Sequence, residues 1–251
     1  MTLSDTRGIT EAAKQARNVL TSIHAGLIVS CQAPEGSPLR HPVHMAAMAQ
    51  AAEMAGAVGI RANGPEFVRA IRAVTDLPII GIDKRSDIDP VAYITPHFES
   101  VVELVRAGAD IIAIDGTSRP RTGTGAPSAN ALLRQIRSEF GNLPVMADVS
   151  NVEEGMMADE SGFDLVATTL SGYTGNGQPG TGPDIELVAR LVKEQSRPVI
   201  AEGRFATPEQ VVAAYGVGAH SVVVGTAITD TLAIARRFAE AVARKAQALR
   251  S

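Results

Sequence analysis

The sequence predicts an α/β protein built as a single (β/α)8 barrel with an extra N-terminal helix. Its 251 residues divide into eight units of about 31 residues, the length of a strand, a helix and two loops. Eight short runs rich in Val and Ile alternate with longer helical patterns, and most of these runs are apolar at nearly every position. Continuous apolar runs are typical of strands that a parallel sheet buries on both faces.

The expected strands recur along the whole chain. They are Leu27–Ser30, Val58–Arg61, Ile79–Ile82, Ile111–Asp115, Val145–Asp148, Leu165–Thr169, Val199–Glu202 and Ser221–Gly225. A doubly wound open sheet is the structural alternative. Such a sheet usually has fewer strands and a glycine-rich first turn, and no Gly-x-Gly-x-x-Gly follows the first run.

Helix start and stop signals lie between the strands. Thr207-Pro208-Glu209-Gln210 combines an N-cap, a first-turn proline and a capping-box glutamine. The other expected helices are Met45–Ala55, Pro65–Val74, Glu99–Ala107, Pro127–Phe140, Asp184–Glu194 and an Ala-rich final helix, Ala233–Ala248. A further pattern over Ile9–Ile23 predicts a helix that covers the bottom of the barrel. We therefore expect a helical extension at residues 1–25 and a catalytic barrel domain at residues 26–251.

Composition argues against several classes of protein. The formal net charge of −4 disfavours a nucleic-acid binder with a basic surface. Cys31 is the single cysteine, and His41 and His44 have no further ligand at metal-site spacing. The first residues lack a secretory signal pattern, and no apolar stretch approaches about 18 residues. We expect a cytoplasmic protein that holds no metal and binds neither a membrane nor nucleic acid.

Polar side chains follow nearly every expected strand. In a barrel of this kind the catalytic groups lie at the carboxyl ends of the strands, because those loops converge on one mouth. The residues in these places are Gln32, Arg61, Lys84, Asp115, Asp148, Thr168, Thr169, Glu202, Gly203, Arg204, Gly225 and Thr226. Strand ends are also polar wherever they reach solvent, but that explanation fits the whole set poorly.

Lys84 and Glu202 are the leading candidates for acid–base chemistry. Lys84 needs desolvation or a neighbouring cation to lose its proton near pH 7, and Arg61 on the adjacent strand can supply that cation. A charged Lys84 would instead act as an acid or an electrostatic clamp. Glu202 can act as a general acid or base or hold a substrate hydroxyl. The alternatives are a solvated lysine in a turn and a salt bridge from Glu202 to Arg204.

Two further features concern phosphate binding and access to the mouth of the barrel. Gly203-Arg204 and Gly225-Thr226 follow the seventh and eighth runs, where many barrels bind phosphate through backbone amides and a cation. The glycine-rich segment 172–183 has the length of a lid over the mouth, and an ordinary long loop fits it equally well. Arg119 and Arg121 are expected to be solvated.

Several strings in the chain resemble one enzyme family. They are Cys31-Gln32-Ala33, Ile60-Arg61-Ala62, Pro78-Ile-Ile-Gly-Ile-Asp-Lys84-Arg85, Tyr93-Ile-Thr-Pro96, Ala147-Asp148-Val-Ser150, Thr168-Thr-Leu-Ser-Gly-Tyr-Thr174 and Glu202-Gly-Arg204. In this order, from about Gly26 to Ala235, they resemble N-acylglucosamine-6-phosphate 2-epimerase, also called N-acetylmannosamine-6-phosphate epimerase. The string that begins at Thr168 is the most specific of them.

The resemblance implies a cofactor-free barrel that interconverts N-acetylmannosamine 6-phosphate and N-acetylglucosamine 6-phosphate in sialic-acid or amino-sugar breakdown. It implies that Lys84 is the acid/base lysine and Glu202 the essential carboxylate. The implied substrate-binding residues are Gln32, Arg61, Asp148 and Thr169, and the implied phosphate-binding residues are Gly203, Arg204, Gly225 and Thr226.

The expected reaction removes the proton at C2, next to the C1 aldehyde of the open sugar, and returns it to the opposite face. Arg61 and Gln32 would stabilise the enolate oxygen, and the sequence leaves open whether one base or two operate. Three other readings stay open: a Schiff-base aldolase or lyase using Lys84, another phosphosugar isomerase, and a sugar-phosphate sensor without chemistry. The final helix can pack against its own barrel or a partner, so a homodimer is possible.

Overall fold

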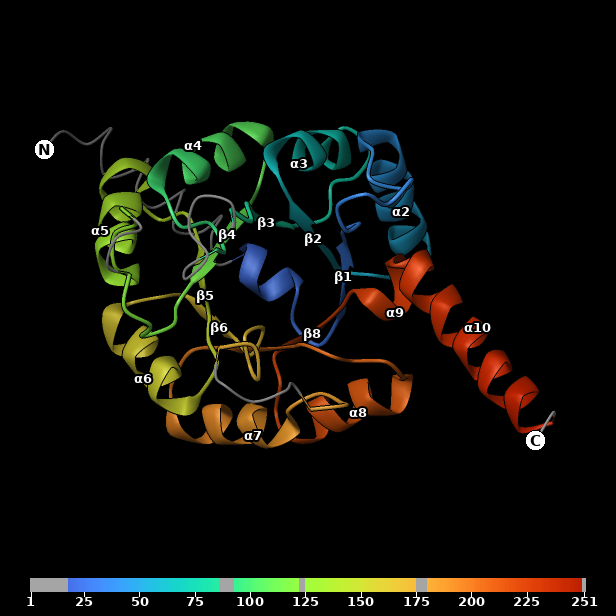
Figure 1. Ribbon diagram of the computed structural model, residues 1–251. Helices are drawn as coiled ribbons and strands as arrows, with labels where there is room; N and C mark the ends of the chain where they lie inside the picture. The colour runs from blue at the N-terminus through green and yellow to red at the C-terminus, as the bar shows by residue number, and fades with distance from the viewer. Residues whose placement is uncertain (1–17, 86–92, 122–124, 175–179, 250–251) are drawn as a thin grey trace, which may run out of the picture.

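The chain folds into a closed parallel barrel ringed by helices (Figure 1). The computed structural model describes residues 18–85, 93–121, 125–174 and 180–249. The strands are β1 (Leu27–Cys31), β2 (Gly59–Asn63), β3 (Ile79–Ile82), β4 (Ile111–Asp115), β5 (Val145–Asp148), β6 (Leu165–Ala167), β7 (Val199–Glu202) and β8 (Ser221–Val224). The helices are α2 (Pro42–Met54), α3 (Pro65–Arg72), α4 (Phe98–Ala107), α5 (Ala129–Phe140), α6 (Val152–Ser161), α7 (Ile185–Glu194), α8 (Pro208–Gly216), α9 (Thr226–Thr229) and α10 (Thr231–Ala248).

Strand pairing confirms the predicted barrel. Each strand pairs in parallel with the next, and β1 closes the ring by pairing with β8 as well as β2, so that Val29 lies between Ile60 and Val224. The strands are buried along almost their whole length. This two-sided burial explains why their sequences are apolar without alternation.

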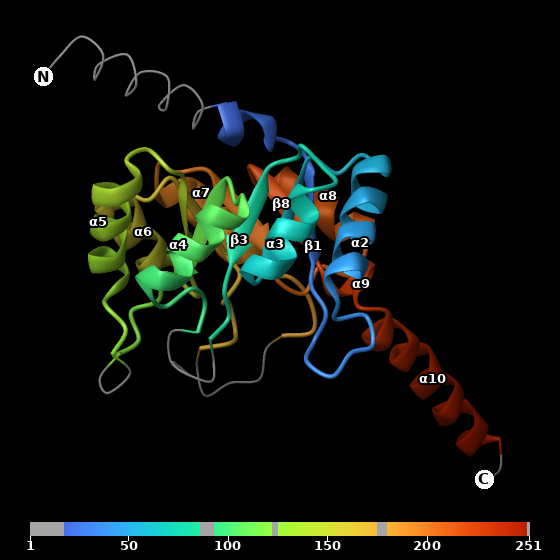
Figure 2. The ribbon, with the colours of Figure 1, turned by 90° about the horizontal axis from the view of Figure 1, so that it is seen from above.

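Apolar side chains fill the interior of the barrel at the amino-terminal end of its strands. Inward side chains such as Ile28, Ile80 and Met146 form one apolar cluster, and Ile23 is buried against it. A helical turn over residues 18–22 lies across this end, opposite the loops that follow the strands (Figure 2). His220 Nε2 lies 2.9 Å from the Leu20 carbonyl oxygen and ties the turn to the barrel. The described part of the expected N-terminal helix therefore covers the bottom of the barrel. The rest of that helix lies outside the described residues.

Helix α6 is absent from the sequence-based expectation. The Asn151 side chain accepts a hydrogen bond from Glu154 N at 2.9 Å and caps the helix, but Gly155 interrupts its pattern. A Cβ atom at Gly155 would lie 2.2 Å from Leu191 Cδ2 of α7. Gly155 thus lets α6 and α7 pack closely, at the expense of the helical signal in the sequence.

Helix α10 projects away from the barrel (Figures 1 and 2). Its main contact within the chain is with α9, and Phe238 and Val242 are 72% and 69% exposed. Asp230 caps the helix by accepting a hydrogen bond from Ala233 N, so the helix begins two residues before the predicted start. No helix in the described part of the chain is long and apolar enough to span a membrane.

Candidate active site

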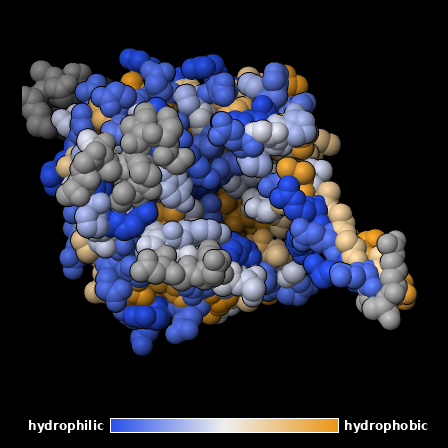
Figure 3. All heavy atoms as spheres, viewed as in Figure 1, coloured by the Kyte–Doolittle hydropathy of each residue, from blue (hydrophilic) through white to orange (hydrophobic). Residues whose placement is uncertain are grey.

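The carboxyl ends of the strands surround one cavity of about 560 Å³. In Figure 3 this cavity is the hollow at the centre of the molecule, with hydrophobic residues visible inside it. Cavities of this size suit a small-molecule ligand. Of the polar residues expected at the strand ends, Asp115, Asp148 and Thr168 do not line it. Those that do are Gln32, Arg61, Lys84, Thr169, Glu202, Gly203, Arg204, Gly225 and Thr226.

Arg61 connects three strands beneath the cavity. Its side chain, from β2, is 1% exposed and donates two hydrogen bonds to Asp148 of β5, at 3.2 and 2.6 Å. Its Nη1 also lies 3.0 Å from Glu202 Oε2 of β7. Burial alone would lower the pKa of Arg61, but Asp148 and Glu202 raise it above its usual range. The guanidinium therefore stays charged and stabilises two buried carboxylates.

Glu202 is held so that its carboxyl group titrates near neutrality. Burial and, to a lesser extent, the nearby charge of Asp148 together raise its pKa to about 7, against the opposing effect of Arg61. The Thr169 hydroxyl lies 3.1 Å from Glu202 Oε2 and 2.7 Å from Asp148 Oδ1, so it can donate to either carboxylate. A carboxyl group with this pKa can both give and take a proton at pH 7.

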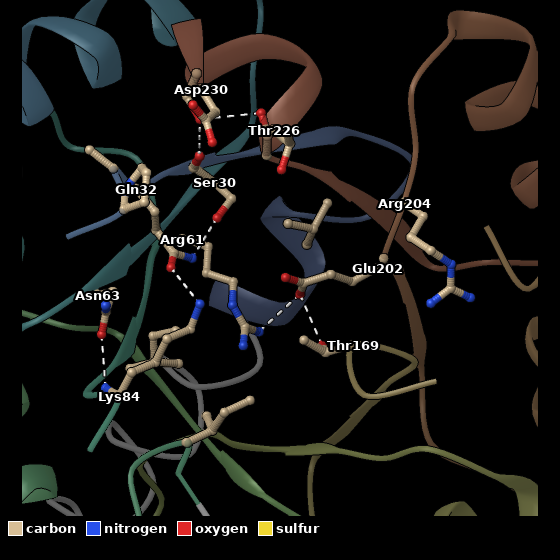
Figure 4. A pocket seen from close by; sticks show the side chains of 18 of the residues that line it. Ser30, Gln32, Arg61, Asn63, Lys84, Thr169, Glu202, Arg204, Thr226 and Asp230 are labelled. Carbon is tan, nitrogen blue, oxygen red and sulfur yellow. Dashed lines mark hydrogen bonds and ion pairs between the residues drawn. The ribbon is translucent and has the colours of Figure 1, made fainter. Parts of the chain in front are cut away.

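Lys84 faces the same cavity from the end of β3 (Figure 4). Its side chain is exposed where it opens into the cavity. Burial lowers the pKa of Lys84, and the Arg61 guanidinium lowers it further. The expectation that Arg61 acts as the neighbouring cation is consistent with this arrangement. An amine and a carboxyl group with pKa values displaced towards each other thus open into one pocket.

Gln32 contacts Lys84 directly. Lys84 Nζ donates to Gln32 Oε1 at 2.9 Å, and Gln32 Nε2 donates to Ser30 Oγ at 2.7 Å. The Lys84 backbone is fixed as well, because its N–H donates to Asn63 Oδ1 at 2.9 Å. Ser30 and Asn63 were not among the site residues predicted from the sequence. Strand alternation was the available signal, since they lie two residues from Gln32 and Arg61 and share their faces.

Arg204 does not pair with Glu202, so the alternative of a local salt bridge is wrong. Its guanidinium donates to the carbonyl oxygens of Ser171 and Gly182 and lies 5.5 Å from the centre of the Tyr173 ring. In Figure 4 it points away from Lys84. Arg204 therefore holds the two ends of the glycine-rich segment together. That segment, the predicted lid, includes residues 175–179, which lie outside the described residues.

The expectation that Arg119 and Arg121 are solvated is wrong. Arg119 Nη2 lies 2.8 Å from Asp115 Oδ2, and Arg121 Nη2 donates to the Asp115 carbonyl oxygen at 2.6 Å. The Asp115 side chain is fully buried. A buried carboxylate without a cation is costly, and this cost explains why both arginines fold back onto it.

Comparison with known proteins identifies the family. A family model described as "Putative N-acetylmannosamine-6-phosphate epimerase" matches residues 45–244. The chain belongs to this epimerase family. Two proteins named "Putative N-acetylmannosamine-6-phosphate 2-epimerase" are similar to this chain over most of their length. That of Caldanaerobacter subterraneus subsp. tengcongensis is 48% identical, over 88% of this chain and 92% of its own. That of Cutibacterium acnes is 45% identical, over 89% and 96%.

A solved structure supports the same family and the barrel fold. It is described as the N-acetylmannosamine-6-phosphate 2-epimerase from Clostridium perfringens, with 42% identity and a TM-score of 0.82. The match covers 88% of this chain and 95% of that one. These similarities confirm the resemblance seen in the motifs. Within the described residues, no group of three or more His, Cys, Asp or Glu side chains could hold a metal ion.

Proposed function

We propose that this member of the epimerase family interconverts N-acetylmannosamine 6-phosphate and N-acetylglucosamine 6-phosphate. The observation that carries the proposal is the shared cavity of Lys84 and Glu202, with the pKa of the amine lowered and that of the carboxyl group raised to about 7. The names of the relatives support the substrate. A phosphorylated sugar is too polar to cross a bilayer unaided, which supports work in the cytoplasm.

The proposed reaction is a proton exchange at C2 of the open-chain sugar. One group removes the C2 proton, and the electron pair moves onto the C1 aldehyde oxygen to give an enolate. The other group then delivers a proton to the opposite face of C2, and the aldehyde re-forms. In one direction neutral Lys84 takes the proton and protonated Glu202 gives one, and in the other direction the roles reverse. The pair therefore carries a single proton at the start of each turnover.

Arg61 provides the positive charge that this enolate needs. The cationic guanidinium lines the cavity between Lys84 and Glu202, and its contacts to Asp148 and Glu202 fix its orientation. A preorganised cation stabilises charge that develops on oxygen without reorganising during the reaction. Asp148 and Thr169 would then act mainly by orienting Arg61 and Glu202, and Gln32 by contacting Lys84.

The phosphate group is proposed to bind where β7 and β8 end. Gly203, Arg204, Gly225 and Thr226 all line that part of the cavity. Gly203 has a φ of 115°, and a Cβ atom at Gly225 would lie 3.2 Å from Ser30 Cβ, so both positions favour glycine. A residue without a side chain leaves its backbone N–H accessible to an anion. The Arg204 guanidinium is engaged by backbone carbonyls, so its part in this site is to shape the loop beside the phosphate.

Incubation of the purified protein with N-acetylmannosamine 6-phosphate in D₂O tests the reaction. We expect NMR to show deuterium at C2 of the newly formed epimer, while the remaining substrate is still unlabelled early in the reaction. A product without solvent deuterium would exclude the proton exchange. Early label in both sugars would contradict the use of two separate groups.

We also propose that the protein forms a homodimer through α10. Phe238 and Val242 are spaced by four residues on one face of this helix, Leu249 follows seven residues later at its C-cap, and each is at least 69% exposed. An apolar helix face of this kind needs a surface to cover it, and the described residues of the same chain do not supply one. A second copy can bury the face reciprocally, as two-fold symmetric dimers do.

A further inference from the structure

A chain of hydrogen bonds runs from the interior of β1 to the reactive amine of Lys84. Ser30 Oγ accepts from Gln32 Nε2 at 2.7 Å, and Gln32 Oε1 accepts from Lys84 Nζ at 2.9 Å. We propose that Ser30 is a positioning residue for Lys84 that acts by anchoring the Gln32 amide. This inference rests on the proposed function only in giving Lys84 a catalytic task.

Ser30 is a rigid anchor. It is 5% exposed, its β1 position pairs with Arg61 of β2, and its carbonyl oxygen accepts from the Thr229 hydroxyl at 2.8 Å. Gln32 lies just beyond the end of β1, and its side chain has three rotatable torsions. A long polar side chain loses conformational entropy when it is fixed. The hydrogen bond to Ser30 offsets part of that loss before any substrate arrives.

The orientation of the Gln32 amide matters for the chemistry of Lys84. An amide oxygen accepts from an amine in either protonation state, because both states carry N–H groups. When Lys84 is neutral, this contact uses an N–H group and leaves the lone pair free for the proton on C2. If the amide nitrogen faced the amine instead, its N–H would occupy that lone pair. The observed arrangement thus keeps Lys84 available as a base.

A double-mutant cycle tests whether Ser30 acts through Gln32. We expect Ser30→Ala to lower kcat by about tenfold, the effect of losing one well-placed hydrogen bond, with little change in KM. Gln32→Met should lower kcat at least as much, and adding Ser30→Ala to it should cause no further loss. Additive effects, or a raised KM with unchanged kcat, would show that Ser30 contacts the substrate directly and would overturn the proposal.

A second measurement needs no turnover. Competitive acylation of Lys84 across a pH series, read by mass spectrometry, reports the pKa of its amine. Loss of the Gln32 acceptor removes a contact that favours the charged form, so the pKa should fall in both single variants. Ser161→Ala removes an exposed hydroxyl that donates to Met157 O on α6 and serves as the matched control. An unchanged Lys84 pKa in Ser30→Ala would contradict the proposal, even if the protein proved to catalyse another reaction.

Discussion

Arg61 Nη1 and Glu202 Oε2 lie 3.0 Å apart inside the barrel, although 140 residues separate them in the chain. The same guanidinium contacts Asp148 and lowers the pKa of Lys84. One buried cation therefore influences both groups of the proposed acid–base pair.

Lys84→Gln should abolish epimerisation while leaving substrate binding largely intact. The variant keeps a polar side chain of similar length but cannot exchange a proton, so kcat should fall by about a hundredfold to ten-thousandfold. NMR would follow turnover, and calorimetric titration would follow binding. Lys193→Gln, at an exposed lysine of α7, is the control and should retain full activity. Turnover by Lys84→Gln within a few fold of the unaltered protein would remove Lys84 from the mechanism.

The rate should depend on pH through Glu202. Because the pair must carry a single proton, kcat/KM should fall as the pH drops through about 7, where Glu202 becomes protonated while Lys84 is still charged. At high pH it should fall again, at a value below the usual pKa of lysine, because burial lowers the pKa of Lys84.

Asp148→Asn should move the acidic limb of this profile to lower pH. The Asp148 charge raises the pKa of Glu202, so its removal makes Glu202 easier to ionise. The loss also leaves Arg61 more available to Glu202, which acts in the same direction. Asp76→Asn changes an exposed carboxylate and should leave the profile unchanged. A limb that stays in place or moves upward would contradict this electrostatic account.

Arg61→Met should destabilise the protein by about 3–5 kcal/mol, because it leaves two buried carboxylates without a cation. Urea unfolding would measure the change. The loss should be larger at pH 8 than at pH 5, because burial raises the pKa of Glu202, Arg61 opposes that rise, and without Arg61 the ionisation of Glu202 at the higher pH costs more. Arg69→Met, at an exposed position of α3, should change the stability by less than about 0.5 kcal/mol. A similarly small effect at Arg61 would mean that the carboxylates are not held by its charge.

Phe238→Glu should convert the proposed dimer to monomers, because it places a charge in the apolar face of α10. Sedimentation velocity would measure the mass in solution. Gln247→Glu adds the same charge at an exposed position on the opposite side of the helix, about 180° around its axis from Phe238, and should leave the dimer intact. If the unaltered protein sediments as a monomer, the proposed role of α10 is wrong.

The barrel could be predicted from sequence because its signals are local. Runs such as Ile111–Asp115 are apolar throughout, and the capping box at Thr207 is observed as expected. Helix α6 was missed because Gly155 serves a contact with Leu191 that only the folded chain contains. The cluster of site residues at one mouth also followed from topology, since parallel strands of a barrel end on the same side.

The pairing within the site could not be predicted in the same way. Sequence proximity offered Arg204 as an alternative partner of Glu202, but the Arg204 backbone has a φ of 59° and its guanidinium donates to the carbonyl oxygens of Ser171 and Gly182. The partner that does contact Glu202 comes from β2. The contacts between inward side chains depend on how the strands are staggered around the barrel. No local sequence pattern encodes that stagger.

The central position of Arg61 has a consequence for how such a protein can change. A substitution that retunes the proton affinity of the reactive groups by altering this side chain also removes an internal brace between β2, β5 and β7. Adaptation towards a new substrate would therefore need compensating changes elsewhere in the barrel before, or together with, any change at this residue. Substitutions should accumulate more readily in the loops around the cavity mouth. Those loops can change the shape of the entrance while the contacts of Arg61 stay in place.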